Sequence, residues 1–568
     1  MNEEPLDPSG GASRSPAPPV LLRPRREVFE YGLLPIPKLI FTDGTSTLET
    51  LKKKLLERAV SRQQTRIDAR GVAEVLDISI DHALLILDTL ASVLPSDPDP
   101  HAPEGTADVY DLVIFLYIQS YKRLLPKGHK DSTSVGDVWP HSSPFDRYLS
   151  VLSPLQLVRS NSRRSVPSQT DEEAHQLSYL QKHLPNILDL LAEPVAGDDD
   201  ESLVLTHERF EHLGFLIQFG EKKFGVPLTQ AAHFFANSDP DMPNAPAPAA
   251  QILEWILQNV AASLEDTAER MTTKEDIPLS GSDMDAFIPD ASITQVRVES
   301  NISRNVTYSR SQTFVEGISK ASVIKRPSDI KGNSVKVINC HDSVIYLLAP
   351  VGYATIYGCS DTTIVLGAIG KVVKVEHCER VQVITAAKRI CIATCRECLF
   401  FLGVTQRPLI LGDNHNLKVA PYNTFYPQLN EHMAQVGLNA AINRWNEPLA
   451  LGMVDPHDSL SHPAGVSDVP AESATCLDPD QFTNFLIPDG SGGDSAQLTN
   501  DNPFRLPEAY MASQKKRHLA SHDILQAMRN AQLEEKRKRE LASALHIHFK
   551  DWLYASGNIR QLYCLQGD

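Results

Sequence analysis

The sequence predicts a multidomain α + β chain: an N-terminal all-α helical domain, a right-handed parallel β-helix and a C-terminal charged helix. Three observations support this fold class. Apolar residues keep helical spacing from Val28 to about residue 263. Glycine and β-branched residues dominate from about 330 to 425, where a repeat of nineteen residues occurs. A charged helical pattern then runs from Glu508 to about Tyr554.

The composition excludes several function classes. The chain has 568 residues, and its 54 Lys and Arg against 71 Asp and Glu give a net charge of −17, which disfavours nucleic acid as a partner. No run approaches the roughly 18 apolar residues of a membrane span. The acidic, Pro- and Ser-rich start does not resemble a secretory signal, so we expect a cytoplasmic protein with unused sequons at Asn301 and Asn305. Eight cysteines are too few for a disulfide scaffold.

The N-terminal half is expected to consist of helices joined by polar loops. Residues 1–26 are rich in Pro, Gly and Ser and are expected to be disordered. Residues 27–263 are predicted to form one all-α domain of about seven helices. In these segments, apolar residues recur at helical spacing after Ser, Thr or acidic residues of the kind that begin helices. The expected helices cover 45–60, 80–93, 109–124, 171–191, 207–224, 228–236 and 249–263. A polar, acidic linker is expected over 264–300.

The C-terminal half is divided by the same criteria. A β-helix is expected over 301–425, a mostly loop-rich extension over 426–505 and a helical segment over 506–568. The stretch EEKRKRE at 534–540 mixes both signs of charge, which is typical of a solvated helix face. A coiled-coil partner is the alternative, although the apolar positions hold no clean heptad.

Four cysteines mark the repeat. Cys340, Cys359 and Cys378 are nineteen residues apart, Cys395 follows after seventeen, and Asn414 takes the same place nineteen later. The positions three before, five before and five after each marker are all apolar, and the two positions directly after it are polar. The apolar columns are Val337, Ile356, Val375, Ile392 and Leu411; Val335, Ala354, Val373, Ile390 and Leu409; and Ile345, Ile364, Val383, Phe400 and Val419.

This pattern predicts stacked coils. Alternation within a coil indicates strands, and recurrence at a fixed distance indicates that like residues lie over like. The polar pair after each marker then forms a corner exposed to water. We therefore expect Cys340, Cys359, Cys378 and Cys395 to form an internal column of buried, reduced and metal-free thiols.

Two other motifs in this region are weaker. Cys391, Cys395 and Cys398, with His377 and Cys378 nearby, are possible zinc ligands, but the repeat places Cys391 on the opposite face from the marker cysteines. The stretch 367–371 (GAIGK) is similar to a phosphate-binding loop, but only two residues separate its glycines and Val372 follows the lysine. We interpret this stretch as a turn and expect no metal and no cofactor.

The coils also resemble a known family. SVIYLLAPVGYATIYGC (343–359), TTIVLGAIGKVVKVEHC (362–378) and RPLILGDNHNLKVAPYN (407–423) resemble the C-CAP/cofactor C-like domain of tubulin-folding cofactor C, which is a β-helix. The likeness continues outside the coils, in FLYIQ (115–119), the pair Trp139 and Pro140, PYNTFYPQLNEHMAQVGL (421–438) and Trp445. These outer segments resemble a multidomain branch of the family and not the cofactor itself.

The resemblance implies where a catalytic residue would lie. Finger-bearing members carry Gln-Gln-Phe-Arg-Leu-His-Asp-Cys, in which the arginine reaches a GTP-binding partner and stabilises the transferred phosphoryl group. The matching stretch here is 388–395 (KRICIATC), so Cys391 occupies the finger position, and the glutamines and histidine are also absent. Arg389 lies two residues away on the same outward face. It is either a displaced finger or an ordinary solvated arginine.

Three functions follow as alternatives. The first is a non-catalytic scaffold or adaptor, which the resemblance links to spindle poles and other microtubule-organising centres, organelle positioning and cell shape. The second is a tubulin-folding cofactor or GTPase-activating protein; the thiol at Cys391 argues against it. The third is a β-helix interaction module with other partners. We expect protein partners, with tubulin or a small GTPase as candidates, on the outward β-helix face, and a cytoplasmic, cytoskeletal location.

Overall fold

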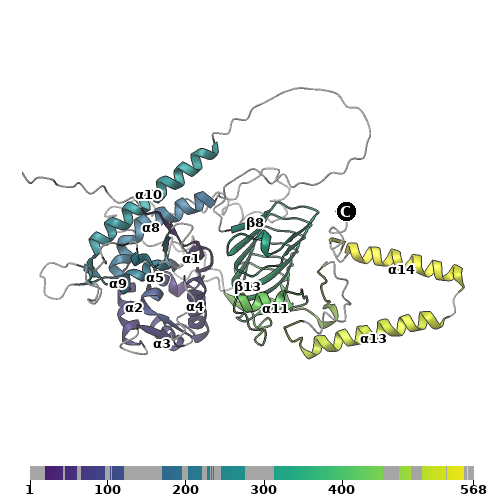
Figure 1. The fold of residues 1–568 in the computed structure, drawn as a ribbon. Coiled ribbons are helices and arrows are strands. Elements are labelled where there is room, and N and C mark those ends of the chain that lie inside the picture. Colours follow the sequence, from purple (N-terminus) through teal and green to yellow (C-terminus); the bar gives the residue numbers. More distant parts are fainter. Residues whose placement is uncertain are drawn as a thin grey trace, which may run out of the picture.

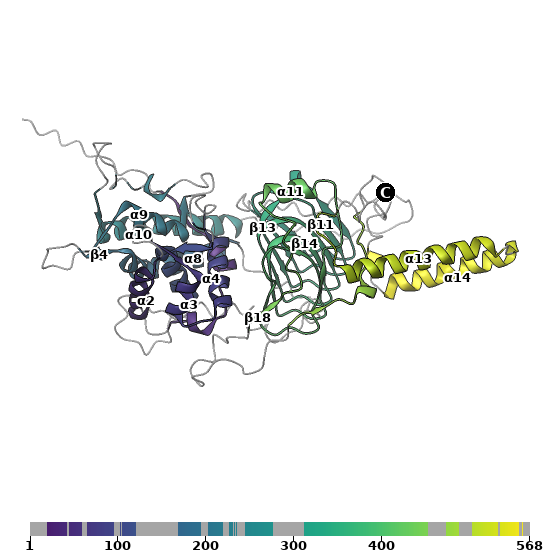
Figure 2. The same ribbon diagram turned by 90° about the horizontal axis from the view of Figure 1, so that it is seen from below.

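The computed structural model describes residues 20–120, 169–275, 312–451, 473–487 and 502–560, with gaps at 42–44, 60–64, 96–102, 104, 195–202, 220–226, 231, 233–234, 236–244, 532–533 and 556–558. The N-terminal helices lie on one side of a parallel β-helix, and two C-terminal helices project from its other side (Figures 1 and 2). The predicted fold class is confirmed. Trp139, Pro140, Asn301 and Asn305 lie outside the described residues.

The N-terminal domain is helical because its apolar stripes face a common core. Side chains cap four of its described helices at their first turns: Asp68 accepts from the amide of Gly71, Ser79 from His82, Asp108 from Tyr110 and Thr206 from Arg209. The helix that starts at Val109 is buried on nearly every side, as its composition predicts. The helices are α1 (Arg26–Tyr31), α2 (Ser46–Glu57), α3 (Ala69–Leu76), α4 (Ile80–Val93), α5 (Val109–Gln119), α8 (Gln169–Leu191), α9 (His207–Glu211) and α10 (Ala249–Glu275).

Several expected boundaries in this domain are wrong. Residues 22–24 were expected to be disordered, but β1 (Leu22–Pro24) pairs with β6 (Ile217–Phe219). The helix expected over 207–224 ends early, because β6 follows a short 3-10 turn. In the helix expected over 228–236, the described residues include a 3-10 turn at Leu228–Gln230. Helix α10 continues into the expected linker as far as Glu275. The domain is mainly helical, as predicted, and also contains strands of two or three residues.

Two further small sheets support the helices. Strand β2 (Arg66–Asp68) pairs with β3 (Thr106–Asp108), which places the caps of α3 and α5 side by side. Strands β4 (Glu193–Pro194), β5 (Leu203–Leu205) and β7 (Ala247–Pro248) form the other sheet, at the start of α10. Strands of two or three residues are too short to show the alternation of apolar and polar residues that indicates a strand, so the sequence did not predict these sheets.

The β-helix is a stack of coils whose strands all pair in parallel. The first coil is made of β8 (Gln312–Glu316) and β9 (Ser322–Lys325). Its successors add β10 (Ser334–Ile338), β11 (Val344–Leu347), β12 (Val351–Tyr357), β13 (Thr363–Glu376), β14 (Gln382–Ala393), β15 (Leu399–Val404), β16 (Leu409–Leu411), β17 (Lys418–Pro421), β18 (Leu449–Leu451) and β19 (Thr475–Cys476). Val335, Ala354, Val373 and Ile390 lie over one another, as the repeat predicts.

The predicted cysteine column lies at a corner of the coils. Cys340, Cys359, Cys378 and Cys395 are fully buried and not disulfide-bonded, and burial raises the pKa of the Cys378 thiol. The residues directly before and two after each marker adopt left-handed conformations, for example His377 and Arg380 around Cys378. These conformations turn the chain sharply, and their polar residues face water. The reduced, metal-free state of the four marker cysteines stays a prediction, which metal analysis of the purified protein would check.

The last predicted coil is out of step by one residue. The repeat assigned Leu409 and Leu411 to the interior, but β16 pairs Ile410 with Ile392, so Ile410 is the interior residue. Gly412, with a φ of 72°, adds one residue between this strand and Asn414. A shift of one residue turns every side chain of a strand to its other face. Leu409 therefore packs on the N-terminal domain, and Leu411 contacts the same cluster.

The glycine-rich stretch 367–371 is not a turn, as we expected, but lies inside the long strand β13. Register irregularities on both sides bend this strand around the coil. A Cβ at Gly370 would come within 2.9 Å of Val436 Cβ, so the glycine allows the end of α11 (Leu429–Gln435) to pack closely. The stretch serves packing, and no phosphate loop forms.

The extension and the C-terminal helices also contact the β-helix. Phe482, Phe485 and Phe504 are buried against its outward aromatic residues, including Phe401 and Tyr346. Helix α13 (Glu508–Asn530) is anchored by Tyr510, whose hydroxyl donates to Leu477 O. After α14 (Glu535–Ala555), Arg560 Nε donates to Asp342 at 2.8 Å. These two helices, here called the arm, are therefore tethered at both ends.

Candidate site between the N-terminal domain and the β-helix

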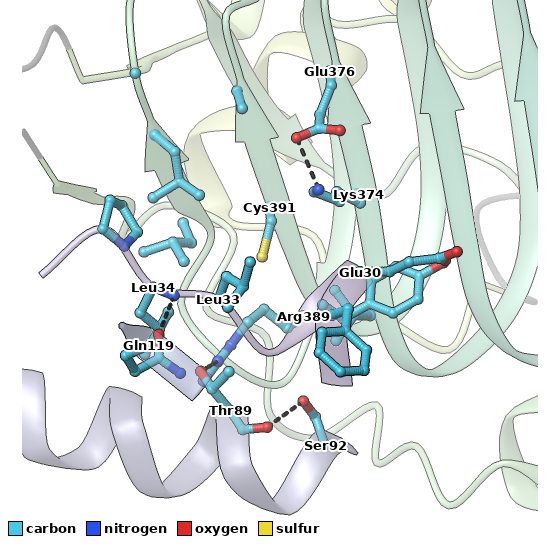
Figure 3. A pocket seen from close by; sticks show the side chains of 18 of the residues that line it. Glu30, Leu33, Leu34, Thr89, Ser92, Gln119, Lys374, Glu376, Arg389 and Cys391 are labelled. Atoms are coloured by element: carbon cyan, nitrogen blue, oxygen red, sulfur yellow. Dashed lines mark hydrogen bonds and ion pairs between the residues drawn. The ribbon is translucent and has the colours of Figure 1, made fainter. Parts of the chain in front are cut away.

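The arginine-finger position lies on β14, and the predicted orientation of this strand is confirmed. Ile390 and Ile392 belong to the interior core of the β-helix, whereas Cys391 contacts the core of the N-terminal domain. Arg389 shares the outward side with Cys391 (Figure 3). The outward side is not open to water here, because α1 and α4 cover it.

Arg389 is buried, so the expectation of an ordinary solvated arginine is wrong. Only 3% of the residue is exposed. Its Nη1 donates to Thr89 Oγ1 at 2.7 Å and its Nη2 to Asp88 Oδ2 at 3.1 Å, both on α4. Burial lowers the pKa of Arg389 and raises that of Asp88, even though each charge favours the other. An arginine stays protonated under such conditions, so the contact is a charged hydrogen-bonded pair.

A stacked pair of tyrosines forms the centre of the same contact. The rings of Tyr31 on α1 and Tyr353 on β12 lie 4.6 Å apart at 22°. Tyr353 OH donates to Ser92 O at 2.6 Å, and Tyr31 OH lies 2.8 Å from Thr355 Oγ1. Both aromatic rings are buried while their hydroxyls keep a partner, the arrangement that interfaces favour.

Charged residues flank the tyrosines. Lys336 Nζ on β10 lies 2.8 Å from Glu30 Oε1 on α1, and both side chains are mostly buried. Burial alone would raise the pKa of Glu30, but the cation of Lys336 outweighs it and the net shift is downward. At the other side, Arg407 lies 3.6 Å from Asp81 on α4. The contact thus spans the outward face from β10 to the segment before β16.

A cavity of about 380 Å³ lies within this contact (Figure 3). Apolar residues contribute most of its walls, including Leu33, Leu34 and Leu409. The polar part is formed by Arg389, Cys391 and the ion pair of Lys374 with Glu376 at 2.9 Å. Burial raises the pKa of the Cys391 thiol despite the nearby cations, so this group is protonated at neutral pH and is not an activated nucleophile.

Apolar residues at outward positions of the coils are a signal of this contact in the sequence. Outward positions of the coils should be polar if they face water, yet Tyr353 and Val372 occupy two of them. These residues join the apolar core of the N-terminal domain. Part of the outward face that we expected to bind partners is therefore covered by this chain itself.

The structure separates the candidate zinc ligands. Cys378, Cys395 and Cys398 face the interior of the β-helix, whereas Cys391 faces the N-terminal domain. Within the described residues, one group has the geometry to hold a metal ion: Asp108, Asp111 and His212. The imidazole already contacts both carboxylates, at 2.7 Å to Asp111 and 3.7 Å to Asp108. No described helix is long and apolar enough to cross a membrane.

Comparisons with known proteins agree with the geometry. Residues 332–449 match the family described as Tubulin binding cofactor C. Over a longer stretch the chain is similar to TBCC domain-containing protein 1 of Rattus norvegicus, with 24% identity over 470 residues covering 80% of this chain and 75% of the rat protein. The Homo sapiens protein is 24% identical over 467 residues, covering 80% and 77%. The Gallus gallus protein is 31% identical over 243 residues, covering 43% and 41%.

These matches confirm the resemblance. Most of the β-helix matches the tubulin binding cofactor C family, and helices lie on both sides of it in the described part of the chain. Over 80% of its length the chain is similar to TBCC domain-containing protein 1.

Proposed function

We propose that this chain is a non-catalytic scaffold or adaptor that helps to organise microtubule-organising centres such as spindle poles, and through them organelle positioning and cell shape. The likeness to TBCC domain-containing protein 1 over four fifths of the chain supports the family-level part of this proposal. One observation carries the non-catalytic part: the chain's own N-terminal domain occupies the face on which finger-bearing relatives present their arginine.

The position of Arg389 argues against a displaced finger. A finger contributes about 10³–10⁵ in rate because its guanidinium reaches the transferred phosphoryl group. Both Nη atoms of Arg389 are bound to α4, and the side chain is buried. A catalytic group displaced by even about 1 Å loses much of its effect. Cys391, at the finger position itself, has no guanidinium.

The alternative is a tubulin-folding cofactor or GTPase-activating protein, which would require the N-terminal domain to move away from β14. Single-turnover GTP hydrolysis by tubulin, with the other folding cofactors, and by small GTPases decides between the two. We expect no acceleration by the full chain beyond background. An acceleration of about tenfold or more that Arg389→Ala abolishes would contradict the proposal.

The arm offers the adaptor a surface for a protein partner. Ten large apolar residues on its two helices are exposed, among them Leu545, Phe549 and Trp552. The same helices carry nine Lys and Arg against five Asp and Glu, whereas the whole chain has a net charge of −17. Exposed apolar groups within a basic surface favour an acidic protein partner.

Proximity labelling in dividing cells tests the adaptor role. We expect the full chain to label components of a microtubule-organising centre. A chain with Leu545→Ser and Phe549→Ser should lose part of this set, whereas Leu84→Ser, an exposed leucine outside the arm, should keep all of it. Labelling without any enrichment of these components would refute the assignment.

A further inference from the structure

The cavity between the two domains is too large to be a packing defect. Protein interiors contain few voids larger than a water molecule, and the space here is about 380 Å³. This volume lies in the range of pockets that hold small molecules. Leu33 lines the cavity and has 39% of its surface exposed, so it marks an opening to water.

The polar groups of the wall define what the cavity can hold. The side chain of Gln119 accepts from Leu34 N and donates to Gly32 O, and Ser92 Oγ donates to Thr89 O. Lys374 is neutralised by Glu376. Arg389 differs, because its Nε is buried and lacks a hydrogen-bond partner among the described residues. A buried N–H donor without an acceptor costs free energy, which a ligand acceptor would recover.

Charge decides the class of ligand. The cations of the wall are each paired, Arg389 with Asp88 and Lys374 with Glu376. A charged ligand would enter without a free counter-ion, at a large desolvation cost. An uncharged, mainly apolar molecule would leave these pairs intact and bury the leucine walls.

We propose that this cavity binds a small, uncharged and mainly apolar molecule, whose single hydrogen-bond acceptor meets Arg389 Nε. Such a molecule contacts Leu33 and Leu34 of the N-terminal domain together with Leu409 and Cys391 of the β-helix. Its binding stabilises the contact between the two domains. The proposal is independent of the adaptor role, since it concerns the cavity alone.

Thiol labelling of the full chain tests the proposal. The probe is 2-undecanone, an uncharged ketone, and undecanoate is the charged molecule of matched length. We expect the ketone to slow maleimide labelling of Cys391 at least fivefold, measured by peptide mass spectrometry, and undecanoate to have no such effect. Cys476 is exposed and does not line the cavity, so its rate is the internal control.

Two variants, with Leu84→Trp as a control, identify the site. Leu33→Trp at the opening should abolish protection, whereas Leu84→Trp, an equally exposed leucine on α4, should keep it. Arg389→Lys keeps a cation beside Asp88 but removes Nε, and should weaken ketone binding roughly tenfold. If Cys391 does not label in the free protein, the thermal midpoint replaces the labelling rate. Equal effects of ketone and undecanoate, no effect of either, or protection that survives Leu33→Trp would each overturn the proposal.

Discussion

The helices on the two sides of the β-helix both carry large apolar residues, but these residues have opposite environments. In the N-terminal domain the apolar residues of α4 and α5 are mostly buried, and the domain itself covers one face of the coils. In the arm, residues such as Leu545 and Trp552 remain exposed along two helices that project from the coils (Figure 2). An amphipathic pattern therefore predicts a helix, but whether its apolar side is buried depends on the contacts at its ends and on what faces it.

The largest expected effect concerns the domain boundary. Composition predicts that protease cleaves between the two domains, within about 264–290. Helix α10 covers this segment as far as Glu275, and 276–290 lie outside the described residues. Because Tyr353, Arg389 and Lys336 join the domains, we expect the two fragments to elute together in size-exclusion chromatography. A fragment that the protease releases from the arm should not elute with the two large fragments. Separate elution of the two large fragments would show that the contact is weak.

Single substitutions extend the same comparison. Tyr353→Ala should lower the free energy of unfolding by about 3 kcal/mol, because it removes a buried ring stacked on Tyr31. Trp552→Ala in the arm should change it by less than about 0.5 kcal/mol, since Trp552 lies on an exposed helix. Urea denaturation measures the free energy of unfolding of both variants. Similar losses in the two variants would mean that the arm is buried in the protein's normal state.

Replacing Arg389 should lower the free energy of unfolding by less than replacing Tyr353, and GTP hydrolysis provides a functional control. Arg389→Ala should destabilise the chain by about 2 kcal/mol, because it leaves Asp88 and Thr89 of α4 without their partner. It should leave the rate of GTP hydrolysis by added tubulin unchanged. A matched change on the polar corner, Arg396→Ala, should cost much less, since that side chain is half exposed. If Arg389→Ala costs as little as Arg396→Ala, the hydrogen bonds of Arg389 to Asp88 and Thr89 contribute little to stability.

The smallest expected effect is a dependence on pH within the N-terminal domain. Burial alone would lower the pKa of His212, but its hydrogen bond to Asp111 and the charge of Asp108 outweigh this, and the net shift is upward from 6.5. The stabilisation is therefore complete below pH 6.5 and is lost as the pH rises through the higher pKa of the folded state. Urea midpoints across this range should fall with pH, and His212→Gln should remove that slope. An unchanged slope would exclude His212 as the source.

Local patterns predicted much of the architecture. The repeat of nineteen placed Val335, Val337 and Ile345 in the interior, and the structure confirms all three. Ser79 predicted the start of α4 correctly, because capping depends on neighbours in the sequence. The one-residue shift at Gly412 was missed, since it preserves the spacing of the corners while it reverses the faces of β16.

By itself, the sequence determined the coils, their corners and the outward direction of Cys391 and Arg389, because strand alternation and a fixed repeat are local properties. It could not decide what those outward residues meet. Arg389 binds Asp88 and Thr89 some three hundred residues earlier in the chain, and the cavity beside it exists only because two domains come together. Contacts at such separation leave no period in the sequence, so only the tertiary structure distinguishes a solvated arginine from a buried one.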